Sequence, residues 1–293
     1  MAASIGDVAV DTVLTNAEIS ITAADRITAA GTVESQGGQV TLDATGDIQI
    51  NSAVTTDSGS ATANADNDLT FAADGSLTTA GGTILLSADA DSNATGIGGA
   101  IAMSDGSSVD SGSGTITLAA DEDITVSRLV TTNATSSAVT ISITSGSLLD
   151  AGNTGGEDIT ATDPDAVLTI NAATGIGATG NSLETNITTL VASVTGNGVV
   201  NIVETNAIDL AEVTTASGSI TVESGGTLTA TLVDSSATDN DTNDIFLTTT
   251  SGDIMVILID GGSANDVTLT ATGAITEDGQ PSTLVTADLL TAT

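Results

Sequence analysis

Two short acidic stretches hold the side chains of this sequence that are best suited to binding an ion. Both carry Asp and Asn at alternating positions, in the spacing D-x-D-x-N. The residues are Asp239, Asp241 and Asn243, with Asp244 next, in "DNDTND", and Asp89, Asp91 and Asn93 in "DADSN". Because Ca²⁺ prefers several oxygen ligands close together in one loop, both stretches are candidate calcium sites, and the first is the better candidate.

Neither stretch completes the calcium loop of an EF-hand. Asp244 and Ala94 stand where that loop needs its sixth-position glycine, and Thr250 and Ala100 stand where it needs its twelfth-position glutamate. The glycine-rich nonapeptide of calcium-binding β-rolls is absent as well. A second interpretation therefore stays open, in which both stretches are solvated acidic loops and the protein requires no cofactor.

The sequence offers little for catalysis. It contains no His, Lys, Cys, Tyr or Trp, and its only basic side chains are Arg26 and Arg128. We expect each arginine to pair with nearby acids, Arg26 with the adjacent Asp25. An enzyme acting on polysaccharides would need a pair of carboxylates that face a groove. We therefore predict that the protein is not an enzyme, and a polysaccharide-active enzyme is the least favoured alternative.

The charge balance excludes whole classes of partner. Asp and Glu number 38 against two basic residues, which gives a formal net charge of −36. Such a surface repels the phosphates of nucleic acids and of anionic lipids. A run of about 18 apolar residues, the length needed to span a membrane, does not occur. We therefore expect neither nucleic acid binding nor membrane insertion.

Apolar residues recur in a pattern that predicts strands, and the acidic stretches lie in the segments between these strands. They stand at positions i, i+2 and i+8, and the copies are mostly about 20 to 32 residues apart. The copies are Ile19/Ile21/Ile27, Val40/Leu42/Ile48, Leu69/Phe71/Leu77, Ile116/Leu118/Ile124, Leu168/Ile170/Ile176, Val200/Ile202/Ile208, Ile220/Val222/Leu228 and Val267/Leu269/Ile275. The i, i+2 spacing is typical of a strand with one buried face, and small or turn-forming residues separate it from the next strand.

This pattern predicts an all-β protein, a parallel β-helix (β-solenoid) of about a dozen coils. Stacked immunoglobulin-like sandwiches are the main rival, but the sequence has only two Phe and no Tyr or Trp to anchor their cores. Val, Ile, Leu, Ala and Thr must fill a narrow core instead. We expect deep burial at positions such as Leu118, Ile170 and Val222.

A longer repeat overlies the short one. The stretches that begin at Leu69, Leu168 and Val267 follow one another at steps of 99 residues without a gap. Glycines recur in all three copies, as Gly81, Gly180 and Gly279. We interpret these glycines as structural corners. With only two prolines and no hinge-like stretch, residues 1–293 are predicted to form a single continuous solenoid.

The segment "GIGATGNSLETNITTLVASVTGNGVVNIVETNAIDL", followed shortly by "GSITVESGGTLTA", resembles the shaft repeats of filamentous-haemagglutinin-type bacterial adhesins and related giant surface proteins. The resemblance implies a right-handed parallel β-helix. It also implies export, display on the cell surface, and a role in adhesion or in building a matrix. It extends to the shaft alone, since no secretion and capping domain of such proteins is recognised.

Two functions follow as expectations. In the first, copies of the chain stack head-to-tail into an extracellular filament, because "SIGDVAVDTVLTNAEISIT" and "STLVTADLLTAT" both look like ordinary strand sequence. In the second, the chain is a shaft fragment of a giant adhesin. Its neighbours are then adjoining repeats of a longer chain, and its targets are host or neighbouring-cell surfaces.

Overall fold

The structure is a computed structural model and describes residues 6–89, 98–152 and 156–293. The chain divides into two compact units. The N-terminal unit comprises Met1–Ala134, Ala138–Gly146 and Ala151–Thr160, and the C-terminal unit comprises Thr135–Ser137, Ser147–Asp150 and Ala161–Thr293. Strands joined by turns, bends and irregular segments make up the described residues, and no helix long and apolar enough to cross a membrane occurs among them.

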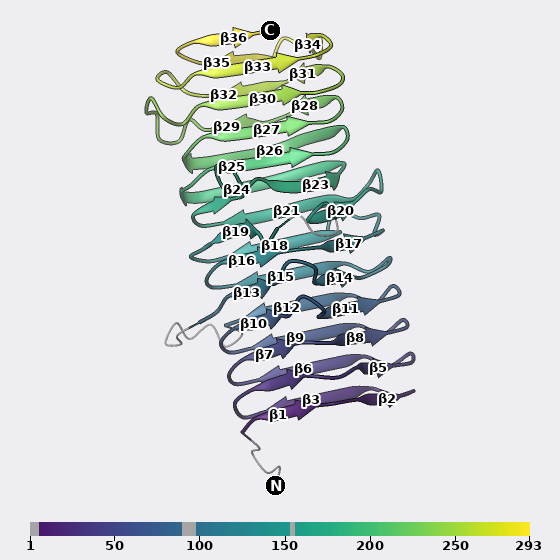
Figure 1. Ribbon diagram of the computed structural model, residues 1–293. Helices are drawn as coiled ribbons and strands as arrows, with labels where there is room; N and C mark the ends of the chain where they lie inside the picture. Colours follow the sequence, from purple (N-terminus) through teal and green to yellow (C-terminus); the bar gives the residue numbers. More distant parts are fainter. Residues whose placement is uncertain (1–5, 90–97, 153–155) are drawn as a thin grey trace. The chain divides into compact units, whose positions relative to one another are not determined.

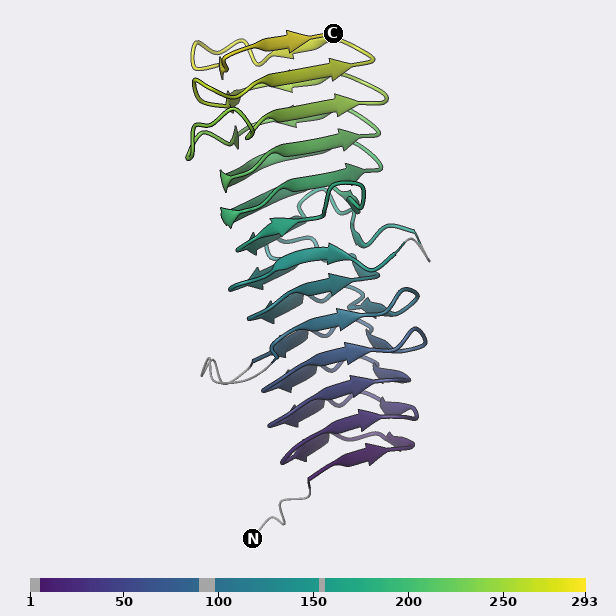
Figure 2. The same ribbon diagram turned by 60° about the vertical axis from the view of Figure 1, so that its left-hand side comes forward.

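Parallel strands stacked one on another build each unit (Figures 1 and 2). The N-terminal unit contains three stacks. The first consists of β1 (Val8–Val10), β4 (Ile27–Ala29), β7 (Ile48–Ile50), β10 (Leu69–Phe71), β13 (Ile101–Met103) and β16 (Ile124–Val126). The second consists of β2 (Val13–Thr15), β5 (Val33–Ser35), β8 (Ala53–Thr56), β11 (Ser76–Thr79), β14 (Ser108–Asp110) and β17 (Leu129–Thr131). The third consists of β3 (Ile19–Ala23), β6 (Val40–Ala44), β9 (Ala61–Ala65), β12 (Ile84–Ala88), β15 (Ile116–Ala120) and β18 (Val139–Ile143).

The C-terminal unit also contains three stacks. The first consists of β19 (Ser147–Asp150), β22 (Gly175–Ile176), β25 (Val200–Glu204), β27 (Ile220–Ser224), β30 (Ile245–Thr249), β33 (Val267–Ala271) and β36 (Leu290–Ala292), and β23 (Leu183–Ile187) also pairs with β25. The second consists of β21 (Val167–Ala172), β24 (Thr189–Asn197), β26 (Ile208–Ser217), β28 (Leu228–Ala230), β31 (Ile254–Val256) and β34 (Ile275–Glu277). The third begins on the long strand β26 and continues through β29 (Val233–Asp234), β32 (Leu258–Asp260) and β35 (Leu284–Thr286). The remaining strand, β20 (Ile159–Ala161), crosses the boundary between the units.

Strand lengths follow a regular cycle in the N-terminal unit, and the same cycle returns at the end of the C-terminal unit, after the long strands β24 and β26 of nine and ten residues. In the N-terminal unit, each five-residue strand is followed by two shorter strands, as in β3, β4 and β5. In the C-terminal unit, β33 is likewise followed by the three-residue strands β34 and β35. Each cycle is one turn of a solenoid. The predicted fold, an all-β parallel β-solenoid of about 12 turns, is confirmed.

Small aliphatic side chains fill the core. Along most strands, buried residues alternate with exposed or half-buried ones, as in β6, where Val40, Leu42 and Ala44 are buried and the two residues between them are not. Leu118, Ile170 and Val222 have no exposed surface, so their predicted burial is confirmed. Each inward residue lies directly above its counterpart in the previous turn, as Leu118 lies against Leu86 and Ile141. Because these aliphatic side chains pack on residues of the same kind, the narrow core needs no aromatic anchors.

Buried hydroxyl groups close one corner of the solenoid. Thr79 and Ser111 donate hydrogen bonds to the carbonyl oxygens of Gly82 and Gly114, three residues further on, at 2.6 and 2.7 Å. The same bond occurs in the C-terminal unit, where Thr249 donates to the carbonyl of Gly252 at 3.1 Å. These hydroxyls face inward with at most 1% of their residue surface exposed. Each one satisfies a backbone carbonyl that the turn removes from the strand ladder.

Glycines stack at this corner of the N-terminal unit. A Cβ on Gly82 would lie 2.0 Å from the carbonyl oxygen of Gly59, and a Cβ on Gly114 would lie 2.0 Å from that of Gly82. A Cβ on Gly59 would lie 2.1 Å from the carbonyl oxygen of Gly38. The backbones of successive turns therefore approach one another too closely here for any side chain.

The three copies of the 99-residue repeat occupy definite places. Leu69 begins β10 and Val267 begins β33, whereas Leu168 is the second residue of β21. Gly81, Gly180 and Gly279 have positive φ values of 139°, 81° and 75°, as expected for corners. Within the C-terminal unit, however, β21 and β33 belong to different stacks. In this unit, two residues 99 positions apart therefore do not occupy equivalent places in their turns. A single continuous solenoid over residues 1–293 stays a prediction.

Candidate functional site

The better candidate calcium stretch lies in the loop of residues 235–244, between β29 and β30. Asp239 reaches from this loop to the one that follows β32. Its Oδ2 accepts a hydrogen bond from the Ser263 hydroxyl at 2.6 Å, and its Oδ1 accepts one from the Ala264 N–H at 2.7 Å. The Asp239 carboxylate thus holds two neighbouring loops of the C-terminal unit together.

Asn243 and Asp244 support the backbone of the same region. Asn243 is only 2% exposed, and its Nδ2 donates to the carbonyl oxygen of Thr238 at 2.6 Å. Its own carbonyl oxygen accepts from the Ser235 hydroxyl at 2.6 Å. Asp244 Oδ1 accepts from the N–H of Asp266 at 3.0 Å. Both side chains therefore have a structural role within and beside the loop.

The described carboxylates of the two candidate stretches do not form a group of three that could share one ion. Asp241 is exposed, and the three carboxylates of loop 235–244 do not come close enough together to form a group of metal ligands. In the second stretch Asp89 is half-buried, with a φ of 58°. Asp91 and Asn93 lie outside the described residues. Calcium binding at either stretch stays a prediction.

The contacts of Asp239 predict how it titrates. The Ser263 hydroxyl, followed by the Ala264 N–H, lowers the pKa of Asp239 below its usual value of 3.8. Since the folded state binds this proton less readily than the unfolded chain, the stability that the contact provides is present above pH 3.8 and is lost as the pH falls through the folded-state pKa. We expect Ser263→Ala to raise the pKa of Asp239 toward the usual value in an NMR titration.

A remote serine provides the control for this titration. Ser58→Ala changes an exposed turn of the N-terminal unit and should leave the Asp239 titration as it is in the parent. An unchanged pKa in Ser263→Ala would show that the contact does not persist in solution.

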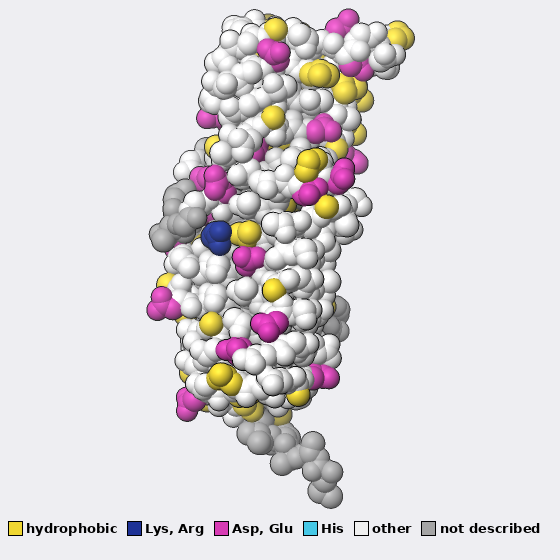
Figure 3. Space-filling view, turned by 90° about the vertical axis from the view of Figure 1, so that its right-hand side faces the viewer, with side chains coloured by type: hydrophobic (Ala, Val, Ile, Leu, Met, Phe, Trp, Pro, Cys, Tyr) yellow, Lys and Arg dark blue, Asp and Glu magenta, His cyan; other side chains and the backbone are white. Residues whose placement is uncertain are grey.

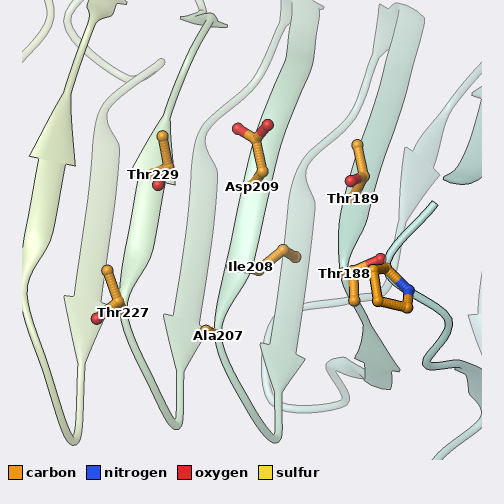
Figure 4. A pocket seen from close by; sticks show the side chains of 8 residues that line it. Thr188, Thr189, Ala207, Ile208, Asp209, Thr227 and Thr229 are labelled. Carbon is orange, nitrogen blue, oxygen red and sulfur yellow. The ribbon is translucent and has the colours of Figure 1, made fainter. Parts of the chain in front are cut away.

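A shallow groove of about 350 Å³ crosses the second stack of the C-terminal unit (Figure 4). Residues of β24, β26 and β28, the turns before them, and one proline line it: Pro164, Thr188, Thr189, Ala207, Ile208, Asp209, Thr227 and Thr229. Thr189, Asp209 and Thr229 are register partners and form a row across the three strands. The Thr231 hydroxyl donates to Asp209 Oδ1 at 2.6 Å.

This groove offers hydrogen-bonding groups but only one titratable group. Asp209 is the single ionisable side chain in its lining. A carboxylate pair does occur elsewhere in the C-terminal unit, where Asp150 and Glu184 bring oxygens within 4.8 Å of each other. Asp150 is 8% exposed, and neither residue lines the groove. The sequence did not single out this pair, because its members come from separate strands. The two features together do not make the carboxylate pair facing a groove that an enzyme acting on sugars would need.

The expected partner of Arg26 is corrected by the structure. Arg26 Nε lies 3.5 Å from Asp47 Oδ2, with the two side chains 41% and 31% exposed. The pair therefore joins successive turns, and Asp25, the adjacent residue, is not the partner in this ion pair. Such an exposed pair contributes at most about 1 kcal/mol. A pairing of Arg128 with nearby acids stays a prediction.

The last turn of the C-terminal unit differs from every turn beneath it. Its strands β34, β35 and β36 pair with β31, β32 and β33, and in the described residues they have no partner on the other side. Val200, Ile220, Ile245 and Val267 form one inward row with no exposed surface, and Leu290, the next member of that row, is 50% exposed. We call this uncovered surface the end surface and define it by Ile275, Glu277, Val285, Leu290 and Ala292.

Acidic side chains are scattered over the face seen in Figure 3, and basic ones are almost absent from it. Both arginines precede residue 129, so residues 161–293 contain no cationic side chain. No protein-family model matches the sequence, and no curated protein or solved structure is detectably similar to it. The fold defines the chain as a β-solenoid protein. Its function is inferred from the geometry of its own residues.

Proposed function

We propose that the chain is a structural, non-enzymatic protein of the cell exterior whose turns stack head-to-tail with those of other copies into an acidic surface filament. The end surface carries this proposal. It combines unpaired strand edges with half-exposed members of the core rows, and both are features that another solenoid turn would cover.

Other features support the same function. The first turn of the N-terminal unit offers the complementary strands β1, β2 and β3, each paired on one side only in the described residues. Such a contact joins two different surfaces of the same chain, so it does not close on itself and generates an open filament. The external location is supported by the resemblance to adhesin shafts and by the strongly acidic composition, which opposes nucleic acid and anionic membranes.

Leu290 and Leu284 allow a matched test of this proposal. They are 50% and 52% exposed and lie in the same last turn. Leu290 continues an inward row, whereas Leu284 is paired in register with the half-buried outward residue Leu258. We expect Leu290→Asp to weaken association at least about tenfold and Leu284→Asp to leave it unchanged, because only the first places a charge in the proposed junction.

Association is measured by sedimentation velocity and particle length by negative-stain electron microscopy, between about pH 4 and about pH 8 at physiological ionic strength. The proposal is wrong if the parent stays monomeric at every pH and concentration. In that case, the adhesin-shaft interpretation becomes the better one, with the end surface covered by further turns of a longer polypeptide. Equal association of Leu290→Asp and the parent would also exclude the junction described here.

A further inference from the structure

One residue of the end surface does not match the core that it continues. Leu210, Ala230 and Val256 are register partners in successive turns, and they are 0%, 0% and 5% exposed. Glu277 is the next residue of this inward row and pairs in register with Val256. A carboxylate therefore occupies the position where each turn below has an aliphatic side chain. Glu277 is exposed, and in the described residues β34 pairs with β31 alone.

A second copy stacked on this surface would cover Glu277. In chain order the last turn is β34, β35 and β36, so the first strand of an incoming copy, β1, takes the next place along the turn, over β34. β1 has the same length as β34, and its third residue, Val10, faces inward. Continuing the parallel register places Val8 of the incoming copy over Ile275 and Val10 over Glu277. The carboxylate would then lie beneath a valine, in a core row.

Covering an ionised carboxylate in an apolar row is costly without a cationic partner. The C-terminal unit has no such partner, since both arginines precede residue 129. In the incoming copy, the nearest cation along the chain is Arg26, in the corner before the second turn, and it is engaged with Asp47 at 3.5 Å. Ionised Glu277 therefore opposes the same contact that the other end-surface residues favour.

The other charged groups around this position are also acidic. On the C-terminal side, β31 and β33 carry no titratable residue, and the adjoining segments contribute Asp253, Asp278 and Asp288. Asp253 accepts a hydrogen bond from the Ala274 N–H, and Asp278 accepts from the Gln280 N–H and the Thr283 hydroxyl. On the incoming side, Asp7 and Asp11 flank β1. None of these groups can compensate the charge of Glu277.

We infer that Glu277 is a charge gate for head-to-tail association: the filament junction forms readily when this carboxyl group is neutral and is opposed when it is ionised. This inference rests on the proposed function. Because burial favours the neutral form of a carboxyl group, forming the junction takes up a proton. Association therefore strengthens as the pH falls, and a filament assembled in acid separates when it is returned to neutral pH.

The test compares the full-length parent with two substitutions at the gate and one matched control. Glu277→Val restores the side-chain type found one turn below, and Glu277→Gln removes the charge with little change of shape. Glu223→Gln makes the same change of net charge at an exposed, outward position of β27. Association constants are measured by sedimentation at about pH 4.5, close to the ordinary pKa of glutamate, and at about pH 7.5, far above it. Far-UV circular dichroism verifies that each variant is folded.

We expect the parent to associate at least about tenfold more tightly at the lower pH than at the higher one. Glu277→Val should associate as tightly at the higher pH as the parent does at the lower. At the higher pH, the association constant of Glu277→Gln should lie between those of Glu277→Val and the parent. Glu223→Gln should associate as the parent does at both pH values, because Glu223 lies outside the proposed junction and its charge is not covered when the junction forms.

The outcomes separate this inference from the proposed function. If the parent forms filaments equally well at both pH values and the Glu277 variants match it, the filament stands and the gate is wrong. If Glu223→Gln relieves the pH dependence as fully as Glu277→Gln, overall charge is responsible and the gate is again wrong. If no variant associates at any pH, the proposed function and the gate both fail.

Discussion

Ile170→Asp is expected to unfold the C-terminal unit at temperatures at which the parent is still folded. Ile170 lies in β21 with no exposed surface, and its register partner Ala192 is 1% exposed. An aspartate there would place a charge without a cationic partner in an aliphatic row. We expect a loss of about 3–5 kcal/mol in the free energy of unfolding, or a chain that does not fold. Thermal and urea unfolding followed by circular dichroism measures this loss.

The neighbouring Asn171 supplies the control. It is exposed on the outer side of the same strand, and Asn171→Asp adds the same charge while hardly changing the side-chain shape. Its free energy of unfolding should stay within about 0.5 kcal/mol of the parent. If Ile170→Asp melted at the same temperature as Asn171→Asp, the assignment of the inward face of β21 would be wrong.

Gly82→Ala is expected to be nearly as damaging, although it adds only a methyl group. The new Cβ would lie 2.0 Å from the carbonyl oxygen and 2.4 Å from the carbonyl carbon of Gly59. Both atoms belong to the backbone, so a side-chain rotation cannot relieve the clash. The two turns would have to separate at this corner, where Thr79 also bonds to the Gly82 carbonyl. We expect a loss of about 3 kcal/mol in the free energy of unfolding of the N-terminal unit.

Gly6→Ala is the matched substitution for this experiment. A Cβ on Gly6 would meet nothing within 4 Å. Its effect on thermal unfolding should therefore be within about 0.5 kcal/mol. A Gly82→Ala protein as stable as Gly6→Ala would show that the turns do not approach as closely at this corner as the structure indicates.

The periodicity of the sequence was enough to predict the fold. Apolar residues at i and i+2 define the inward face of a strand locally, because successive side chains of a strand point to opposite sides. Their recurrence after each turn requires parallel stacking, since every copy must place its apolar face in the same core. The burial of Leu118, Ile170 and Val222 and the positive φ of Gly81, Gly180 and Gly279 follow from the same local information.

The sequence did not predict which residues of different turns meet. Arg26 pairs with Asp47, which lies 21 residues ahead, because β4 and β7 are aligned in the same stack with that offset. The offset is not constant: β7 and β10 are also 21 residues apart, but β10 and β13 are 32 residues apart. A partner in space therefore cannot be found by counting along the chain.

The acidic stretch at Asp239 shows the same limit at a candidate site. Its D-x-D-x-N spacing indicated oxygen ligands directed at one ion. In the folded chain, Asn243 points into the loop and Asp239 bonds to Ser263 and Ala264 instead. Those two residues belong to the next turn, and their contact with Asp239 depends on how successive loops stack.

The sequence by itself determined the strands, the inward faces and the acidic character of the chain, because each follows from residue types within a few positions of one another. Only the tertiary structure decided the register between turns, which brings Gly82 against Gly59 and places Glu277 above Val256 in an uncovered core row. The physical reason is that turn length varies along the chain. The register is then fixed by backbone hydrogen bonds between strands. Because every residue type offers the same backbone groups, the sequence does not show which residues of two turns will pair.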